Sequence, residues 1–519
     1  MTKTISTREF AYEALLAVER DGMQSHLVIR DVLQKMKCAV PEESRIGADD
    51  AAESGAGKNG ARSAAGERNP ARERAFFLRL VEGTIEYRLQ LDYIINLYSK
   101  TKTQKMRPGI REILRMAVYQ ILYMDSVPDR AAVNEAVSLA VKKGFGGLRG
   151  FVNGVLRTIV REKEKLIKED VWPDRKKHPA RAISVRYSIA EDIVKAWLPR
   201  FGEEKTEAVC RAFLEERPLS VHWFNGACQG GSEERPLTEE RVNSATQEKS
   251  EGRQAEKILR PTGILEGSFF LDKGMDPSEL PGFREGRLYI QDLSSQIAVA
   301  AADIRPGDRV LDLCAAPGGK SLLAAERGAE VTARDLTEEK TALIRQNAKR
   351  LGLLHETAES GFPGVFVETA DAVVYDPSLE ASFDVVIADL PCSGFGVCGR
   401  KPEIKYKSYR ETVTALAELQ RKILTNAVRY VRPGGKLLYS TCTIAEEENE
   451  ANVRWLLETY GACGPEKELC FRKAEPAILE AHAVLVGEYG VQLLPCDGPW
   501  DGFFFSVLQR EKPDAPGSW

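Results

Sequence analysis

Two cysteines stand in short polar motifs where a thiol could do chemistry. Cys392 lies in DLPCSGFGVC (389–398) and Cys442 lies in STCT (440–443). A cysteine can attack carbon, bind a metal or be an inert buried group. The sequence has no C-x-x-C pair, and none of its five histidines is close to either cysteine, so neither zinc nor a Cys–His hydrolase is expected. Both cysteines follow predicted strand ends, which favours a chemical role over simple packing.

A glycine-rich turn lies upstream, in VLDLCAAPGGKS (310–321). The pattern predicts a buried strand, a tight turn and a helix start, and Gly318 and Gly319 leave backbone amides free to bind a ligand. A phosphate loop would need glycine where Cys314 stands, so a nucleoside triphosphate site is not expected. Cys314 itself is interpreted as a packing residue.

Acidic residues end the three strands predicted next along the chain, at Asp335, Asp371 and Asp389. Carboxylates at such strand ends suit the ribose hydroxyls and the base of an adenosine ligand. These residues alone leave both a dinucleotide and S-adenosylmethionine open.

One reaction that would use a ligand-binding sheet and two thiols but no metal is methylation at carbon 5 of cytosine. A thiolate adds to carbon 6, which makes carbon 5 nucleophilic, and a base later removes the carbon 5 proton. The cytosine must leave its stack to reach such a site. Arg400, Lys401 and Lys405 are candidates to stabilise a thiolate or to hold RNA phosphates, and Asp389 is a candidate to bind the cytosine edge.

The elements that must position these residues change along the chain. Apolar residues repeat at three and four through the N-terminal part, which predicts helices, whereas strands and helices alternate from about residue 287, which predicts a doubly wound parallel sheet. The predicted ranges are a helical domain at 1–165 with a disordered insertion at 38–74, a linker at 166–183, a small α+β subdomain at 184–286 with a disordered insertion at 226–257, an α/β domain at 287–512, and a tail at 513–519.

The charge and apolar composition of the chain indicate which partners and which compartment to expect. The net charge is −4, but residues 76–180 hold 20 lysines and arginines against 12 acidic residues, so a basic surface is expected there. The start of the chain resembles an amphipathic helix rather than a signal peptide, and no apolar run reaches membrane-spanning length. We therefore expect a cytoplasmic protein without disulfides.

Several motifs together resemble the RNA cytosine-5 methyltransferase family, and the helical part resembles the RNA-binding NusB domain. The resemblance implies an all-α NusB-like domain followed by a Rossmann-like, S-adenosylmethionine-dependent methyltransferase domain. It also implies a 16S ribosomal RNA substrate, methylated at cytosine 967, and a monomer. The motifs are LDLCAAPGGKS, ADLPCSGFGV, RKPEIKY, LQRKIL, RPGGKLLYSTCTIAEEENE and DGFFF for the first family, and AAVNEAVSLAVKKG and GFVNGVLRTIV for the second.

The resemblance also implies roles for individual residues. Cys442 would be the nucleophile and Cys392 would assist release of the product, a choice that the residues alone do not make. A methyltransferase for tRNA or another RNA, and a non-catalytic NusB-like RNA-binding factor, are the alternatives. The chain departs from the family at 223–225, where WFN replaces Arg-Val-Asn, and in having Tyr406 for Trp. The implied cofactor-binding residues are Cys314, Ala315, Ala316, Pro317, Gly318, Gly319, Lys320, Asp335, Asp371 and Asp389.

Overall fold

The chain forms two compact units in the computed structural model. The first contains Met1–Cys210 and Arg400–Lys407, and the second contains Arg211–Gly399 and Ser408–Trp519. The structure describes residues 5–21, 23, 25–38, 70–168, 171–224, 259–272, 277–357, 361–461, 469–474 and 485–512. Most of both predicted insertions and the whole tail lie outside these residues, although 70–74 begin a helix instead of belonging to an insertion.

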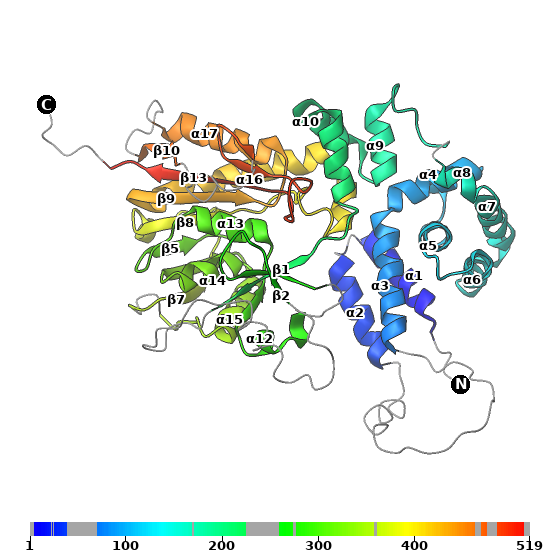
Figure 1. The fold of residues 1–519 in the computed structure, drawn as a ribbon, viewed down its shortest axis with the longest axis horizontal. Coiled ribbons are helices and arrows are strands. Elements are labelled where there is room, and N and C mark those ends of the chain that lie inside the picture. The colour runs from blue at the N-terminus through cyan, green and yellow to red at the C-terminus, as the bar shows by residue number, and fades with distance from the viewer. Residues whose placement is uncertain are drawn as a thin grey trace, which may run out of the picture. The chain divides into compact units, whose positions relative to one another are not determined.

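The first unit is helical, as its periodicity predicts (Figure 1). The central helix α5 is buried along most of its length, since its neighbours pack around it in one apolar cluster. Its α-helices are α1 (Thr7–Asp21), α2 (Ser25–Cys38), α3 (Pro70–Glu86), α4 (Arg88–Tyr98), α5 (Pro108–Tyr123), α6 (Asp129–Lys142), α7 (Arg149–Arg161), α8 (Lys163–Ile167), α9 (Pro179–Tyr187) and most of α10 (Glu191–Ala212), and η2 (Thr103–Lys105), η3 (Gly146–Leu148) and η6 (Pro402–Tyr406) are 3₁₀ turns.

The division between the units differs from the predicted ranges in two ways. Residues 184–210, which the sequence groups with the small subdomain, form the end of α9 and most of α10 in the helical unit. The segment 400–407 also belongs to that unit, although the α/β pattern surrounds it in the sequence. None of the described helices is long and apolar enough to cross a membrane.

The second unit contains a large twisted sheet. Its parallel strands run in the order β7-β6-β5-β8-β9, so the order reverses beside β5, where open α/β sheets bind ligands. The sheet is mixed rather than wholly parallel, because β13 pairs antiparallel with β9. The parallel strands are β5 (Arg309–Asp312), β6 (Glu330–Asp335), β7 (Gly364–Thr369), β8 (Phe383–Asp389) and β9 (Val431–Thr441), and β10 (Phe471–Lys473), β11 (Leu485–Val486), β12 (Val491–Leu493) and β13 (Phe503–Arg510) complete the sheet.

Helices cover both faces of this sheet (Figure 1). Adjacent residues of a strand point to opposite faces. Val310 accordingly packs in the cluster that holds the apolar side chains of the helices before β7, whereas Leu311 packs in the cluster of the later helices. The first group is α13 (Leu293–Ala301), α14 (Gly319–Glu326) and α15 (Glu338–Arg350), the second is α16 (Tyr409–Tyr430) and α17 (Glu450–Tyr460), and η5 (Pro377–Leu379) and η7 (Glu446–Glu448) are 3₁₀ turns.

A small antiparallel sheet precedes the large one, in the order β2-β3-β1-β4. Its apolar cluster includes Trp223, the first residue of the WFN departure, which is 1% exposed. The elements are β1 (Leu219–Trp223), β2 (Leu259–Pro261), β3 (Ser268–Leu271), β4 (Leu288–Ile290), α12 (Pro281–Arg284) and the turn η4 (Pro277–Glu279). The predicted fold class, helical followed by α/β, is confirmed.

Candidate active site

The glycine-rich turn lies between β5 and α14, as its sequence predicts. Gly318 has φ of +109°, which favours glycine, and a Cβ on Gly319 would stand 2.9 Å from Nε2 of Gln291. Gln291 is 8% exposed, and among the described residues its Oε1 atom has no hydrogen-bond donor. The turn therefore presents backbone close to polar groups at the carboxyl edge of the sheet.

Two of the predicted acids lie where neighbouring strands end: Asp335 is the last residue of β6, and Asp371 lies just beyond β7. Asp335 is 3% exposed and accepts hydrogen bonds from the amides of Ala316, at 3.0 Å, and Leu336, at 2.7 Å. Lys340 donates to the same carboxylate at 2.9 Å. Asp371 is exposed and accepts from a backbone amide two residues later. A carboxylate has about four lone-pair sites, so both retain capacity for a ligand.

The third acid, Asp389, is joined to the glycine-rich turn by an ion pair. Lys320 is 7% exposed, and its Nζ atom lies 2.6 Å from Oδ2 of Asp389 and 2.7 Å from the hydroxyl of Ser295. Ser440, at the end of β9, donates to the other oxygen of Asp389 at 2.7 Å. These bonds fix the carboxylate between the loop after β5 and the strand that leads to Cys442.

The two motif cysteines lie side by side. The sulfur atoms of Cys392 and Cys442 are 3.2 Å apart, after β8 and β9 respectively, and both side chains are half-buried. The pKa of Cys392 is raised well above its ordinary range, first by the hydrogen bond to Cys442 and then by burial. Either sulfur can be the donor of this hydrogen bond, so one thiol of the pair can stabilise a thiolate on the other.

A buried carboxylate anchors the loop that carries Cys392. Glu448 is 0% exposed and accepts from the amide of Ser393 at 2.9 Å, from its hydroxyl, and from Nε2 of Gln420 at 3.1 Å. Burial raises the pKa of this carboxyl, although these hydrogen bonds lower it. The Ser393 hydroxyl also lies 2.8 Å from that of Thr443, so the residues after both cysteines are bonded to each other.

Sequence reasoning missed Ser295, Ser393, Gln420 and Glu448 as parts of this site. The run EEENE in the motif RPGGKLLYSTCTIAEEENE was a signal for Glu448, but the sequence does not show which of three adjacent glutamates is buried: Glu446 and Glu447 are exposed. Asp312 was also missed. It is 1% exposed at the end of β5, accepts from Ser321 at 2.7 Å, and burial raises its pKa to about 7.

Other sequence expectations meet different outcomes. Cys314 is half-buried against the apolar cluster of the later helices, and burial raises its pKa. Cys398 is fully buried, which suits a packing residue. Lys405 was predicted as a candidate to stabilise a thiolate or to hold RNA phosphates, and this prediction was wrong. It is 0% exposed in the helical unit with Nζ 3.7 Å from Glu86, so it is not available to RNA.

The arrangement fits S-adenosylmethionine. A glycine turn that excludes a Cβ, carboxylates at the ends of β6 and β8 and just beyond β7, and a buried lysine together suit an adenosine joined to an amino acid. The described residues contain no group of three or more His, Cys, Asp or Glu side chains able to hold a metal.

Comparison with known proteins gives concordant results. Residues 299–509 match the family model for the 16S rRNA methyltransferase RsmB/F, and residues 5–161 match the NusB family. The chain is 31% identical over 515 residues, 98% of its length and all of the relative's, to the probable ribosomal RNA small subunit methyltransferase B of Bacillus subtilis. It is 29% identical over 416 residues to ribosomal RNA small subunit methyltransferase B of Vibrio cholerae, covering 77% of this chain and 81% of that one.

Solved structures share the fold. The crystal structure of PH0851 aligns over 98% of this chain and 100% of its own, with a TM-score of 0.69 and 20% identity. A methyltransferase homologue from Pyrococcus horikoshii aligns over 65% of this chain and 100% of its own, with a TM-score of 0.51 and 21% identity.

Proposed function

Because the chain belongs to the RsmB/F family of 16S ribosomal RNA methyltransferases, we propose that it methylates carbon 5 of one cytosine, cytosine 967, through a covalent adduct at carbon 6. The observation that carries the proposal is the pair of sulfur atoms 3.2 Å apart, at the same sheet edge as the glycine-rich turn.

The hydrogen bond between the two sulfur atoms supports a thiolate on one of them. With Cys442 as the thiolate, the S–H group of Cys392 would donate to it and stabilise its charge. The assignment of the thiolate to Cys442 rests on the resemblance to the RNA cytosine-5 family.

The proposed reaction forms and breaks one protein–RNA bond. The thiolate of Cys442 adds to carbon 6 of the cytosine, and the electron pair moves to carbon 5, which takes the methyl group. A base then removes the carbon 5 proton, the double bond reforms, and the carbon–sulfur bond breaks to release Cys442. Cys392, next to the leaving sulfur, assists this release. Asp389, fixed by Lys320 and Ser440, binds the cytosine edge.

S-adenosylmethionine supplies the methyl group when bound. The proposed binding residues are the turn at 314–320 together with Asp335, Asp371 and Asp389. Asp335 and Asp371 suit the ribose and the adenine, because Asp335 ends β6 and Asp371 follows the neighbouring strand β7. The fit of the turn and the carboxylates supports this assignment.

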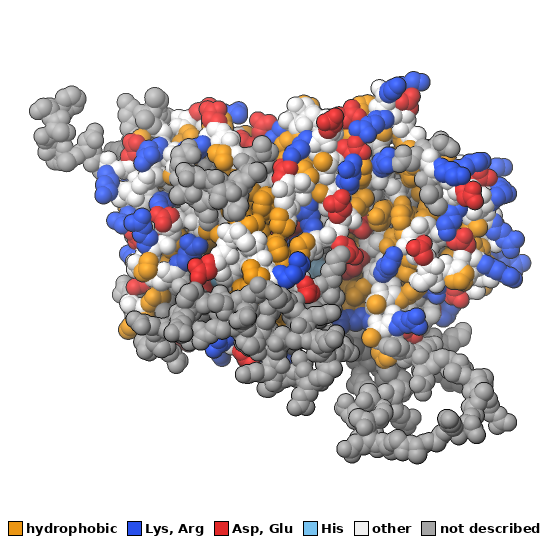
Figure 2. Space-filling model, viewed as in Figure 1, with side chains coloured by type: hydrophobic (Ala, Val, Ile, Leu, Met, Phe, Trp, Pro, Cys, Tyr) orange, Lys and Arg blue, Asp and Glu red, His pale blue; other side chains and the backbone are white. Residues whose placement is uncertain are grey.

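Lysine and arginine side chains gather over α6, α7 and α8 of the helical unit (Figure 2), and we propose that they contact RNA phosphates. Acidic side chains are fewer on this surface, so it attracts the RNA backbone, and the attraction weakens with salt. The exposed cations of these helices and of the residue that follows α8 are Arg130, Lys142, Arg149, Arg157, Arg161, Lys165 and Lys168.

Tritium transfer from labelled S-adenosylmethionine into unmodified 16S RNA tests the activity. Bisulfite sequencing of the product then identifies the cytosine, and transfer into tRNA alone would reject the proposed substrate.

Replacement of each thiol tests the assigned roles. Cys442→Ala should abolish both methylation and covalent protein–RNA complexes, because no group remains to attack carbon 6. Cys392→Ala should instead accumulate a covalent complex in the presence of methyl donor, because release is impaired. Denaturing gel electrophoresis with labelled RNA measures the complex, and exchanged phenotypes would reverse the assignment.

A further inference from the structure

The helical unit contains a cavity of about 590 Å³. Residues of α1, α4, η2, α5, α9, α10 and η6 line it. We call it the arginine pocket, because its lining includes Arg88, Arg111, Arg115 and Arg181.

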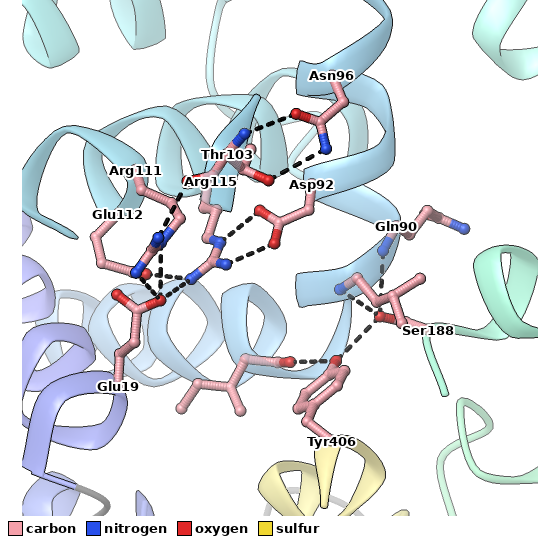
Figure 3. A network of polar contacts seen from close by, with 12 residues as sticks. Glu19, Gln90, Asp92, Asn96, Thr103, Arg111, Glu112, Arg115, Ser188 and Tyr406 are labelled. Atoms are coloured by element: carbon pink, nitrogen blue, oxygen red, sulfur yellow. Dashed lines mark hydrogen bonds and ion pairs between the residues drawn. The ribbon is translucent and has the colours of Figure 1, made fainter. Parts of the chain in front are cut away.

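One wall of the arginine pocket is neutral overall (Figure 3). Arg115 is 3% exposed and donates to both oxygens of Asp92, at 2.7 and 2.6 Å, and to Glu19 at 2.8 Å. Arg111 donates to the same Glu19 oxygen at 2.9 Å. Burial raises the pKa of Glu112 beside them to about 8, so this carboxyl is mostly neutral at pH 7. Two guanidinium groups thus face two carboxylates.

The other two arginines have no carboxylate partner in the described part of the chain. Arg88 lies over the ring of Tyr406, 5.0 Å from its centroid, and Arg181 is exposed in the first turns of α9. One more acid, Glu191, lines the cavity, but Lys195 lies 2.7 Å from it. The uncompensated charge of the arginine pocket is therefore positive and comes from two guanidinium groups.

Tyr406 holds Arg88 in place. Its hydroxyl lies 2.7 Å from the carbonyl oxygen of Ile85, 2.8 Å from that of Glu86 and 3.0 Å from the hydroxyl of Ser188. A ring fixed by these bonds favours a position of the Arg88 guanidinium over it, which reduces the side-chain entropy lost when Arg88 binds an anion.

We propose that the arginine pocket binds one unstacked nucleotide of the RNA substrate, with its phosphate between Arg88 and Arg181. This inference rests on the proposed function. The volume falls within the range of about 300 to 1,000 Å³ typical of small-ligand sites. Guanidinium groups match phosphate oxygens in geometry, and proteins that bind single-stranded RNA hold bases against aromatic rings and arginine planes. Tyr93 and Tyr406 line the pocket.

Substitution of the two arginines in the full-length protein tests the proposal. Arg88→Gln and Arg181→Gln each remove one charge, and binding of an unmodified 16S fragment is measured by fluorescence anisotropy at several salt concentrations. We expect the Kd to rise about tenfold or more for each, the usual effect of losing a charged hydrogen bond. The slope of log Kd against log salt should fall by about one for a lost phosphate contact. Arg186→Gln removes the same charge from α9 outside the lining and should bind as the wild type does.

The outcomes separate this proposal from the proposed function. Wild-type methylation together with unchanged RNA affinity in both variants would overturn the nucleotide site and leave the methyltransferase intact. Binding needs no methyl donor, so weakened RNA binding supports the site even if no methyl transfer is found. Inorganic phosphate and cytidine 5′-monophosphate are titrated in parallel. If they raise the Tm of the wild type but not of the variants, while RNA affinity is unchanged, the pocket binds a free anion and the proposal is wrong.

Discussion

Cys392 and Cys442 are 50 residues apart in sequence, and the residues that follow them hold the two sulfur atoms together. The hydroxyls of Ser393 and Thr443 hydrogen-bond each other at 2.8 Å, and the carboxylate of Glu448 accepts from the amide of Ser393. A thiol pair needs such support, because a shift of about an ångström in catalytic geometry can cost roughly a hundredfold in rate. At the scale of single residues, the site is therefore a thiol pair with a buried carboxylate that positions it.

Glu448→Gln tests this positioning role. The amide keeps one acceptor oxygen but places a donor against Ser393 or Gln420, which should displace the Cys392 loop. Turnover should fall about 10- to 100-fold, the cost of a disrupted buried hydrogen bond to a charged group. If Cys392 assists release, the covalent RNA complex should also accumulate, and the KM for RNA should change little. Steady-state kinetics and denaturing gels measure these quantities.

Ser393→Ala provides the matched control for Glu448→Gln. It removes the hydroxyl bonds to Glu448 and Thr443 but keeps the backbone amide bond, so its defect should be of the same kind and smaller. A folded Glu448→Gln protein with wild-type turnover and no trapped complex would reject the positioning role.

Glu112 makes the stability of the helical unit depend on pH. Its pKa is about 8 in the folded state against 4.5 ordinarily, because burial penalises the charge. Between these values the unfolded chain loses a proton that the folded chain retains, so the free energy of unfolding falls as pH rises from about 4.5 to 8. Glu112→Gln mimics the protonated carboxyl and should remove this dependence. Hydrogen exchange of α5 at pH 6 and 8.5 measures it, and equal pH responses in wild type and variant would contradict the prediction.

At the scale of elements, the first turn of helix α4 is capped by a residue that is distant in sequence. Tyr87, which precedes α4, makes no side-chain cap hydrogen bond. Instead, the Ser188 hydroxyl accepts from the amide of Leu89 at 2.9 Å and from that of Gln90 at 3.4 Å. Ser188 also ends α9 in a left-handed conformation, with φ of +54°. One serine thus joins the end of α9 to the start of α4.

Two substitutions at Ser188 separate its effects. Ser188→Gly loses the hydroxyl but relaxes the left-handed backbone, whereas Ser188→Ala loses the hydroxyl and keeps the strain. Loss of a cap costs about 0.5 to 2 kcal/mol, so the alanine variant should be destabilised by that amount and the glycine variant by less. Urea unfolding of the full-length protein followed by circular dichroism compares them, and an alanine variant as stable as wild type would show that the hydroxyl does not act as a cap.

These elements also show what the sequence was able to predict. Periodicity identified the helical and α/β parts, and the strand pattern placed Asp335, Asp371 and Asp389 at or just after strand ends, because both signals are local in sequence. The bond between Lys320 and Asp389 joins loops 69 residues apart, and the bond between Glu448 and Ser393 spans 55. No local pattern specifies such pairs, since they depend on strand order and on which of several adjacent side chains turns inward.

At the scale of the whole molecule, the chain passes from one unit to the other more than once. Residues 400–407 return to the helical unit between two parts of the second. In the helical unit, Lys405 is fully buried and its carbonyl oxygen accepts from the amide of Ala190 at 2.8 Å. Glu403 accepts from the hydroxyl of Ser25 at 2.9 Å. The helical unit is therefore complete only with a segment supplied from far along the sequence.

A fragment of residues 1–210 should consequently be less stable than the same unit in the full-length protein. Without the segment, Ile85 and Glu86 lose the hydroxyl of Tyr406 that contacts their carbonyl oxygens. A synthetic peptide of residues 399–409 should restore the missing contacts when it is added. At ten times its Kd it adds about 1.4 kcal/mol by mass action, which raises the Tm of a fragment of this size by roughly 3 to 6 °C. A peptide with Tyr406→Phe should bind more weakly, because it lacks the hydroxyl. Thermal unfolding of the fragment with each peptide measures the effect, and a Tm that ignores both peptides would show that residues 1–210 fold independently of the segment.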